Sequence, residues 1–265
     1  MNKKSDRTAT IIIILIIIYL LIPLVVSIIY SMFSNWTGIV PKGFTLQTYV
    51  DLFQDHEFLA SLGRTIVIAI VPIVLTIVLI LLALFVTVIY FPKLEKYVQI
   101  ICMIPYTIQG VILSVSILSL YVGSKSILSN RIIMLIGAYC IIILPYIYQG
   151  IRNGMRAVNM PVLLEAAEML GASRIYAFFR VIVPNILSAI VVSSLLAVGI
   201  IFGDYVLVRN LASSAWPNVQ IYLYQAMKSD SMKSSAVFVV IMAVTFLIAA
   251  VVLYLQSREG KGRKK

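Results

Sequence analysis

The chain has 265 residues, of which 62% are hydrophobic and only 12% are charged. A soluble globule of this length needs a polar surface that so few charged residues cannot supply, so the composition predicts a membrane protein. The formal net charge of +11 does not indicate a nucleic-acid partner, because the basic residues fall between hydrophobic stretches and form no single patch.

Hydrophobic stretches long enough to cross a bilayer, which takes about 20 residues, organise the chain. Six qualify: residues 10–31, 65–90, 98–121, 132–150, 185–207 and 235–256. Nothing long enough for a separate soluble domain remains, so residues 1–265 are predicted to form one all-α transmembrane domain. The first stretch is too long for a secretory signal and no cleavage site follows it, which indicates an uncleaved span.

The basic residues predict the orientation of these spans. If both termini lie in the cytoplasm, fourteen Lys and Arg residues are inside and seven are outside. Positive charge is enriched on the cytoplasmic side of membrane proteins, so we expect both termini inside. The polar segment 151–184 then also lies in the cytoplasm.

The first outer segment, residues 33–63, carries apolar residues at spacings that fit a short interfacial helix. Its single histidine, His56, is predicted to be a solvent-exposed loop residue, because the residues after it do not complete a zinc-binding HExxH pattern. In the third span, Gln109 and Ser116 are seven residues apart and therefore share a helix face. A buried amide needs a partner or water, so Gln109 either lines a polar pathway or bonds a neighbouring helix.

The fifth span carries small residues at intervals of four, in two series. The first series is Ala189, Ser193 and Ala197, and the second is Gly199 and Gly203. Small residues at this spacing let helices approach closely, so we expect packing here. Asp204 follows at the outer end of the span. It is either a pathway residue or an interfacial carboxylate paired with Arg209.

The segment 151–184 is the main polar interruption of the chain. Pro161 suits the first turn of a helix predicted over residues 162–170, and Gly171 suits a left-handed cap. Ser173 can cap a second helix running through Phe179. Glu165 and Glu168, three residues apart, share a face. From the residues alone, this segment is either an ordinary cytoplasmic linker or a docking site.

The same segment resembles the signature of the permease subunits of bacterial binding-protein-dependent ABC importers. That signature has EAA, three residues, Gly, nine residues, a branched apolar residue, any residue, Leu and Pro. Here Glu165-Ala166-Ala167 is followed by Gly171, by Val181 and by Val183-Pro184, with Val183 in place of Leu. Residues 44–65 are similar, more loosely, to the segment that precedes the second core helix in the same family.

The resemblance implies a function for the chain. It implies one permease subunit in the bacterial inner membrane, working with two ATPase subunits, a second permease subunit of the same or another kind, an extracytoplasmic solute-binding protein and membrane lipids. ATP and Mg would be bound by the partners only. The residues implied to couple to the ATPase are Glu165, Ala166, Ala167, Glu168 and Gly171, and those implied to line the pathway are Gln109, Ser116 and Asp204.

Motifs that the sequence lacks argue against an enzyme. It contains no GxxxxGK[ST] phosphate loop, no GxSxG and no HExxH, and Cys102 and Cys140 have no metal-ligand spacing. The alternatives are a secondary transporter or half of one, and a membrane scaffold. Secondary transporters commonly carry charged residues within several spans, and these spans carry few. The resemblance to the family implies a small polar solute, with a polyamine or aminophosphonate favoured and a sugar possible.

Overall fold

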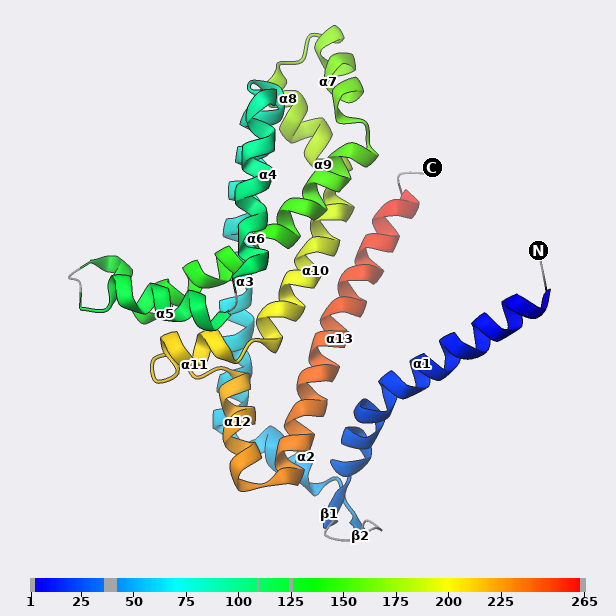
Figure 1. Cartoon of the computed structure of the whole chain (residues 1–265), viewed down its shortest axis with the longest axis vertical. Helices are drawn as coiled ribbons and strands as arrows, with labels where there is room; N and C mark the ends of the chain where they lie inside the picture. Colours follow the sequence, from blue (N-terminus) through cyan, green and yellow to red (C-terminus); the bar gives the residue numbers. More distant parts are fainter. Residues whose placement is uncertain (1–2, 36–41, 109, 124–125, 263–265) are drawn as a thin grey trace. The chain divides into compact units, whose positions relative to one another are not determined.

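The computed structural model describes residues 3–35, 42–108, 110–123 and 126–262 (Figure 1). These residues are nearly all helical, with one two-stranded hairpin that departs from the all-α prediction. The chain divides into two compact units. Unit 1 comprises residues 1–60 and 222–244, and unit 2 comprises residues 61–221 and 245–265.

Helices long and apolar enough to cross a membrane correspond to the predicted spans. Four qualify singly within the described residues, and up to six if each of two bent helix pairs is one span. The long helices are α1 (Lys3–Tyr30), α3 (His56–Ile89), α6 (Arg131–Ala157) and α13 (Ser231–Gly262). His56 is exposed as predicted, but it begins α3 and is not a loop residue.

In unit 1, a short hairpin and helix follow α1. Strands β1 (Phe33–Asn35) and β2 (Lys42–Phe44) are antiparallel, and Phe33 is paired with Phe44. The two rings meet edge-on, with their centroids 5.9 Å apart. Helix α2 (Gln47–Gln54) buries Leu52 and leaves Val50 and Phe53 exposed, as is Leu46 directly before it. The short helix predicted for this region is therefore present as α2, and Phe44 lies before it in the hairpin.

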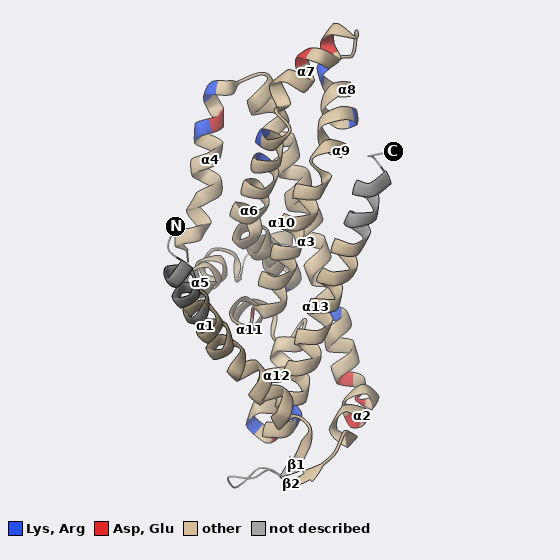
Figure 2. Ribbon diagram, turned by 90° about the vertical axis from the view of Figure 1, so that its right-hand side faces the viewer, with Lys and Arg blue, Asp and Glu red and all other residues tan. Residues whose placement is uncertain are grey.

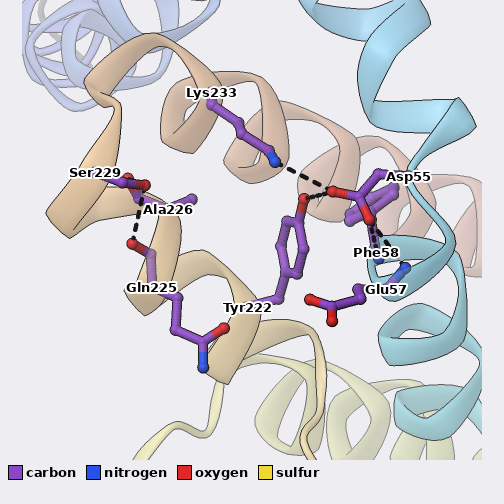
Figure 3. A network of polar contacts seen from close by, with 8 residues as sticks. All are labelled: Asp55, Glu57, Phe58, Tyr222, Gln225, Ala226, Ser229 and Lys233. Atoms are coloured by element: carbon purple, nitrogen blue, oxygen red, sulfur yellow. Dashed lines mark hydrogen bonds and ion pairs between the residues drawn. The ribbon is translucent and has the colours of Figure 1, made fainter.

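A polar network in unit 1 is centred on Asp55, between α2 and α3 (Figure 3). Its Oδ2 accepts hydrogen bonds from Tyr222 Oη at 2.5 Å and from Lys233 Nζ at 3.1 Å. Its Oδ1 accepts from the backbone N–H groups of Glu57 and Phe58, which begin α3. The hydrogen bond from Tyr222, with those from Lys233 and the backbone, lowers the pKa of Asp55 from 3.8 to about 2 against the opposing effect of partial burial.

In unit 2, α6 is the central helix. Residues at every fourth position along it are fully buried: Leu135, Tyr139, Ile143, Ile147, Ile151 and Met155. Because an α-helix has 3.6 residues per turn, each step of four residues turns the stripe by about 40°, so it winds around α6 and buries different sides of the helix along its length. Helix α10 (Leu187–Gly203) runs beside α6 over much of its length (Figure 1).

Glycines on α6 make the contact with α10 close. A Cβ atom added at Gly150 would lie 2.3 Å from Ser193 Cβ, and one added at Gly154 would lie 2.5 Å from Ala189 Cβ. The packing predicted for the small residues of the fifth span is confirmed for Ala189 and Ser193. Within this chain no described atom lies within 4 Å of a Cβ added at Gly199 or Gly203, so the packing predicted for these two residues stays a prediction.

The predicted third span, residues 98–121, is broken. It consists of α4 (Glu95–Met103), the 3-10 turn η2 (Ile104–Thr107) and α5 (Gly110–Tyr121). The two helical parts are bent by 103°. Pro105, in the 3-10 turn, cannot continue the hydrogen-bonding pattern of an α-helix. Gln109 falls at the break and lies outside the described residues.

A second bend lies at the start of the predicted fifth span, residues 185–207. Helix α8 (Arg174–Ala177) continues into a π-helical turn (Phe178–Ile182) and α9 (Val183–Asn185), and this segment meets α10 at 63°. In a regular α-helix Pro184 would clash with the carbonyl four residues earlier, and a wider π-turn directly before it accommodates the ring.

The segment between the fifth and sixth predicted spans is mostly helical. Helices α11 (Val206–Ala212) and α12 (Val219–Ser229) occupy it, and α13 begins at Ser231. In unit 2, Trp216 donates its indole N–H to the carbonyl of Arg64, whose guanidinium donates to the carbonyl of Pro217. These bonds attach the turn before α12 to α3.

Candidate functional site

The segment after α6 turns back through a left-handed residue. Helix α6 ends at Ala157, and Asn159 has φ 50° and ψ 58°. Asparagine tolerates this region better than most residues do. Helix α7 (Met160–Met169) then begins, with Pro161 in its first turn as predicted and with Met160 buried.

A glycine-capped turn ends α7. Gly171 has φ +82°, which confirms the predicted left-handed cap. Its N–H donates to Glu168 O at 2.9 Å, and the N–H of Ala172 donates to Ala167 O at 3.0 Å. These two bonds form a Schellman motif, which satisfies helix carbonyls that would otherwise lack a partner.

Two side chains hold the next helix against this turn. Ser173 Oγ accepts the N–H of Tyr176, so it caps α8 as predicted. Arg174 forms an ion pair with Glu168 across the turn. Glu168 is therefore bound within the chain, whereas Glu165 is exposed. We call residues 160–177 the coupling segment. It lies at the α6–α7 end of unit 2, where charged residues gather (Figure 2).

The coupling segment has an outer face that its own chain does not cover. Met169 and Leu170, at its tip, are each 89% exposed, and Glu165 and Ala166 are exposed beside them. Ala167, by contrast, is buried on the inner face. Met169 and Leu170 therefore form an apolar tip that no described part of the chain covers.

Asp204 lies between α10 and α11 and is half-buried. Its Oδ2 accepts a hydrogen bond from Tyr139 Oη at 3.1 Å and from the N–H of Leu207 at 3.1 Å, so it caps the start of α11. Arg209, offered above as its partner, donates to Tyr205 Oη. Asp204 takes part in no salt bridge with any other residue that the structure describes.

Two serines of the third span, Ser114 and Ser116, face different surroundings. Ser116, predicted to line the pathway, is exposed on α5. Ser114 is buried, and its Oγ accepts a 2.7 Å hydrogen bond from Asn210 Nδ2 of α11. The polar side chain that joins α5 to a neighbouring helix is therefore Ser114, two residues before the one singled out from the sequence.

A pocket of about 470 Å³ opens between α6, α10 and the 3-10 turn before α5. The rings of Tyr106 and Tyr146 meet edge-on in its lining, with centroids 5.1 Å apart. No charged side chain is among the described residues that line it. Its polar side chains belong to Tyr106, Tyr146, Gln149, Asn153, Ser188 and Ser193.

Comparison with known proteins gives the family. The model of the family described as "Binding-protein-dependent transport system inner membrane component" matches residues 65–259. The chain belongs to this family. It is thus a permease of a binding-protein-dependent ABC transporter, as the resemblance predicted, and not an enzyme.

Curated relatives of this permease cover almost all of it. The putative 2-aminoethylphosphonate transport system permease protein PhnV of Salmonella paratyphi A is 20% identical over 241 residues, which are 91% of this chain and 90% of that protein. The protein of the same description from Salmonella typhimurium is 19% identical over the same shares of the two chains.

Two solved structures have the same fold. One is a bacterial ABC transporter involved in the import of the acidic polysaccharide alginate, with a TM-score of 0.74, 18% identity and 96% of each chain covered. The other is a bacterial alginate ABC transporter in complex with an alginate pentasaccharide-bound periplasmic protein, with a TM-score of 0.73, 17% identity and the same coverage. At these identities the likeness shows the fold of the permease alone.

Family membership decides against the secondary transporter and the scaffold as classes. The permease also contains features that sequence analysis missed. Tyr146 and Gln149, near the end of the fourth span, both line the pocket. The Ser114–Asn210 bond joins residues 96 positions apart, and no sequence spacing indicates it.

Proposed function

We propose that this chain is one permease subunit of a bacterial importer with six membrane spans and both termini in the cytoplasm. Each bent helix pair counts as one span, which gives an even number and places both ends on the same side. The excess of basic residues in the predicted cytoplasmic segments favours this orientation. Residues 1–265 then form a single transmembrane domain.

The function rests on the coupling segment, which we propose docks on an ATPase subunit. Its support is the exposed apolar tip, Met169 and Leu170, held on a rigid Schellman turn beside the free carboxylate of Glu165. The apolar tip would enter a cleft on the ATPase, and Glu165 would contact a basic residue there. ATP-driven closure of two ATPases would then move the helices of this chain between inward-open and outward-open states.

The complete importer would need further partners. Two ATPase subunits would bind ATP and Mg, so no cofactor is assigned to this chain. A second permease subunit, identical or different, would complete the passage, and an extracytoplasmic binding protein would deliver the solute. A periplasmic protein is bound in the alginate transporter of the same fold, which supports the last of these.

The solute is proposed to be small and polar. The name of the PhnV relatives favours an aminophosphonate, and the carboxylate of Asp204 suits a solute with an amino group. The uncharged tyrosine, amide and hydroxyl groups of the pocket would equally suit a sugar, which keeps this class as the second candidate. We propose that Gln109, Ser116 and Asp204 line the pathway, together with this pocket.

Gly171→Val tests the docking role. A β-branched residue at φ +82° is strained by about 1–2 kcal/mol or more and would open the Schellman turn. We expect the variant to insert into the membrane but to lose ATP-driven uptake and ATPase binding, measured in vesicles and by co-purification. Gly123→Val is the matched control, since Gly123 has φ +88° and equally open surroundings but lies outside the coupling segment. Uptake by Gly171→Val equal to that of Gly123→Val would contradict the proposal.

A further inference from the structure

One ion pair joins α4 to α6 close to the coupling segment. Arg152, on α6, donates from both Nε and Nη2 to a single oxygen, Oε1 of Glu95, the first residue of α4. The two side chains are 16% and 22% exposed, so water is largely excluded from the contact. A charge pair shielded in this way interacts more strongly than one on an open surface.

The position of the pair in unit 2 gives it a second role besides holding two helices together. Five residues after Arg152, α6 ends and the chain turns into the coupling segment. Behind Arg152, Gly150 and Gly154 lock α6 against α10. Movement of the coupling segment must therefore pass into α6 and α10 as one packed body.

Helix α4 is attached to that body less firmly. Its polar contacts with α6, among the described residues, are the ion pair at its start and a 3.2 Å contact from Gln149 Nε2 to the thioether of Met103 at its end. A thioether is a weak acceptor, so the ion pair is the strong directional link. At the far end of α4 the chain bends by 103° into α5, the second half of the third span.

We propose that the Glu95–Arg152 ion pair transmits displacement of the coupling segment to the broken third span. Glu95 and Arg152 are positioning residues that make α4 follow α6 when the ATPases close. Without the pair, α6 and α10 would still move and ATP would still be hydrolysed, but α4 and α5 would lag behind. The proposal rests on the docking role of the coupling segment proposed above.

The test measures solute uptake and ATP hydrolysis in the same proteoliposomes, in which the whole importer is reconstituted from this chain and its partner subunits. Glu95→Gln and Arg152→Gln each remove one charge; the first keeps the size of the side chain, and the second shortens it. We expect each to lower the number of solute molecules imported per ATP by about tenfold, in the range of ordinary allosteric couplings, with ATP hydrolysis maintained. Arg156→Gln is the control, because Arg156 lies one turn further along α6 and is exposed.

The reversed pair, Glu95→Arg with Arg152→Glu, separates transmission from simple loss of stability. It should restore most of the import per ATP that the single changes remove. Full restoration is not expected, because a carboxylate at the first turn of α4 is favoured by the helix dipole and an arginine there is not. Import per ATP that is unchanged in both single variants would overturn the proposal, as would a reversed pair that restores thermal stability but not import per ATP.

Failure of this proposal differs from failure of the docking role. If the ATPases co-purify with Glu95→Gln at the wild-type level and import per ATP is also wild-type, the ion pair is not the transmitting link, although docking stands. If they co-purify with Gly171→Val as well as with the wild type, docking itself is wrong.

Discussion

Replacing Gly150 by alanine is the most direct test of the α6–α10 contact. The new Cβ would lie 2.3 Å from Ser193 Cβ, 2.8 Å from Ser193 Oγ and 3.4 Å from Ala189 O. Carbon atoms in contact lie about 3.5–4.0 Å apart, so the two helices must separate or shift. Overpacking of this kind costs typically 1–3 kcal/mol. For a chain of this size that corresponds to a melting temperature lower by roughly 3–10 °C.

The structure supplies both a control and a rescue. Gly199→Ala places the same methyl group on α10 where no described atom lies within 4 Å, so it should stabilise by about 0.5–1 kcal/mol through the lower chain entropy of alanine. Ser193→Gly removes the atom that the new methyl group meets. Alone it should destabilise, because glycine weakens a helix, but combined with Gly150→Ala it should stabilise.

Thermal unfolding of the purified permease in detergent measures these changes. A thiol-reactive dye follows the exposure of the two free cysteines, Cys102, which is buried in the folded state, and Cys140, which is half-buried. The expected result is a change of sign for Ser193→Gly between the wild-type and the Gly150→Ala background. A Gly150→Ala variant that melts at or above the wild type would refute the close contact, as would a double variant that melts below both single variants.

Two further predictions concern carboxylates. Asp55→Asn should lower the free energy of unfolding by roughly 1–2 kcal/mol at neutral pH, because charge-assisted hydrogen bonds from Tyr222 and Lys233 are weakened. The pKa of Asp55 is lowered from 3.8 to about 2 in the folded state. The wild type should therefore keep its greater stability above about pH 4 and lose it as the pH falls towards 2. If the melting temperatures of the two proteins differ equally at every pH in that range, this prediction is wrong. Asp204→Asn keeps an acceptor for Tyr139 and for the cap of α11, so we expect a nearly unchanged melting temperature but uptake reduced about tenfold if the charge attracts the solute. Wild-type uptake kinetics in that variant would exclude Asp204 from the pathway as a charge.

The local parts of this protein followed from short stretches of sequence. The spans were predictable because each needs only its own run of apolar residues to satisfy the bilayer. The turn at Gly171 and the cap at Ser173 were predictable because both depend on backbone groups within a few residues. The family signature lies in the same stretch, which is why the function could be inferred from it.

The contacts between helices were decided by the tertiary structure alone. The small-residue series at Ala189 and Ser193 faces Gly150 and Gly154, whereas Gly199 has no close neighbour among the described residues. Both series look alike in sequence, and only the register of the neighbouring helix separates them. The Glu95–Arg152 ion pair joins residues 57 positions apart. Such a partner depends on how two helices pack, and hydrophobic periodicity says which face of a helix is buried but not what lies against it.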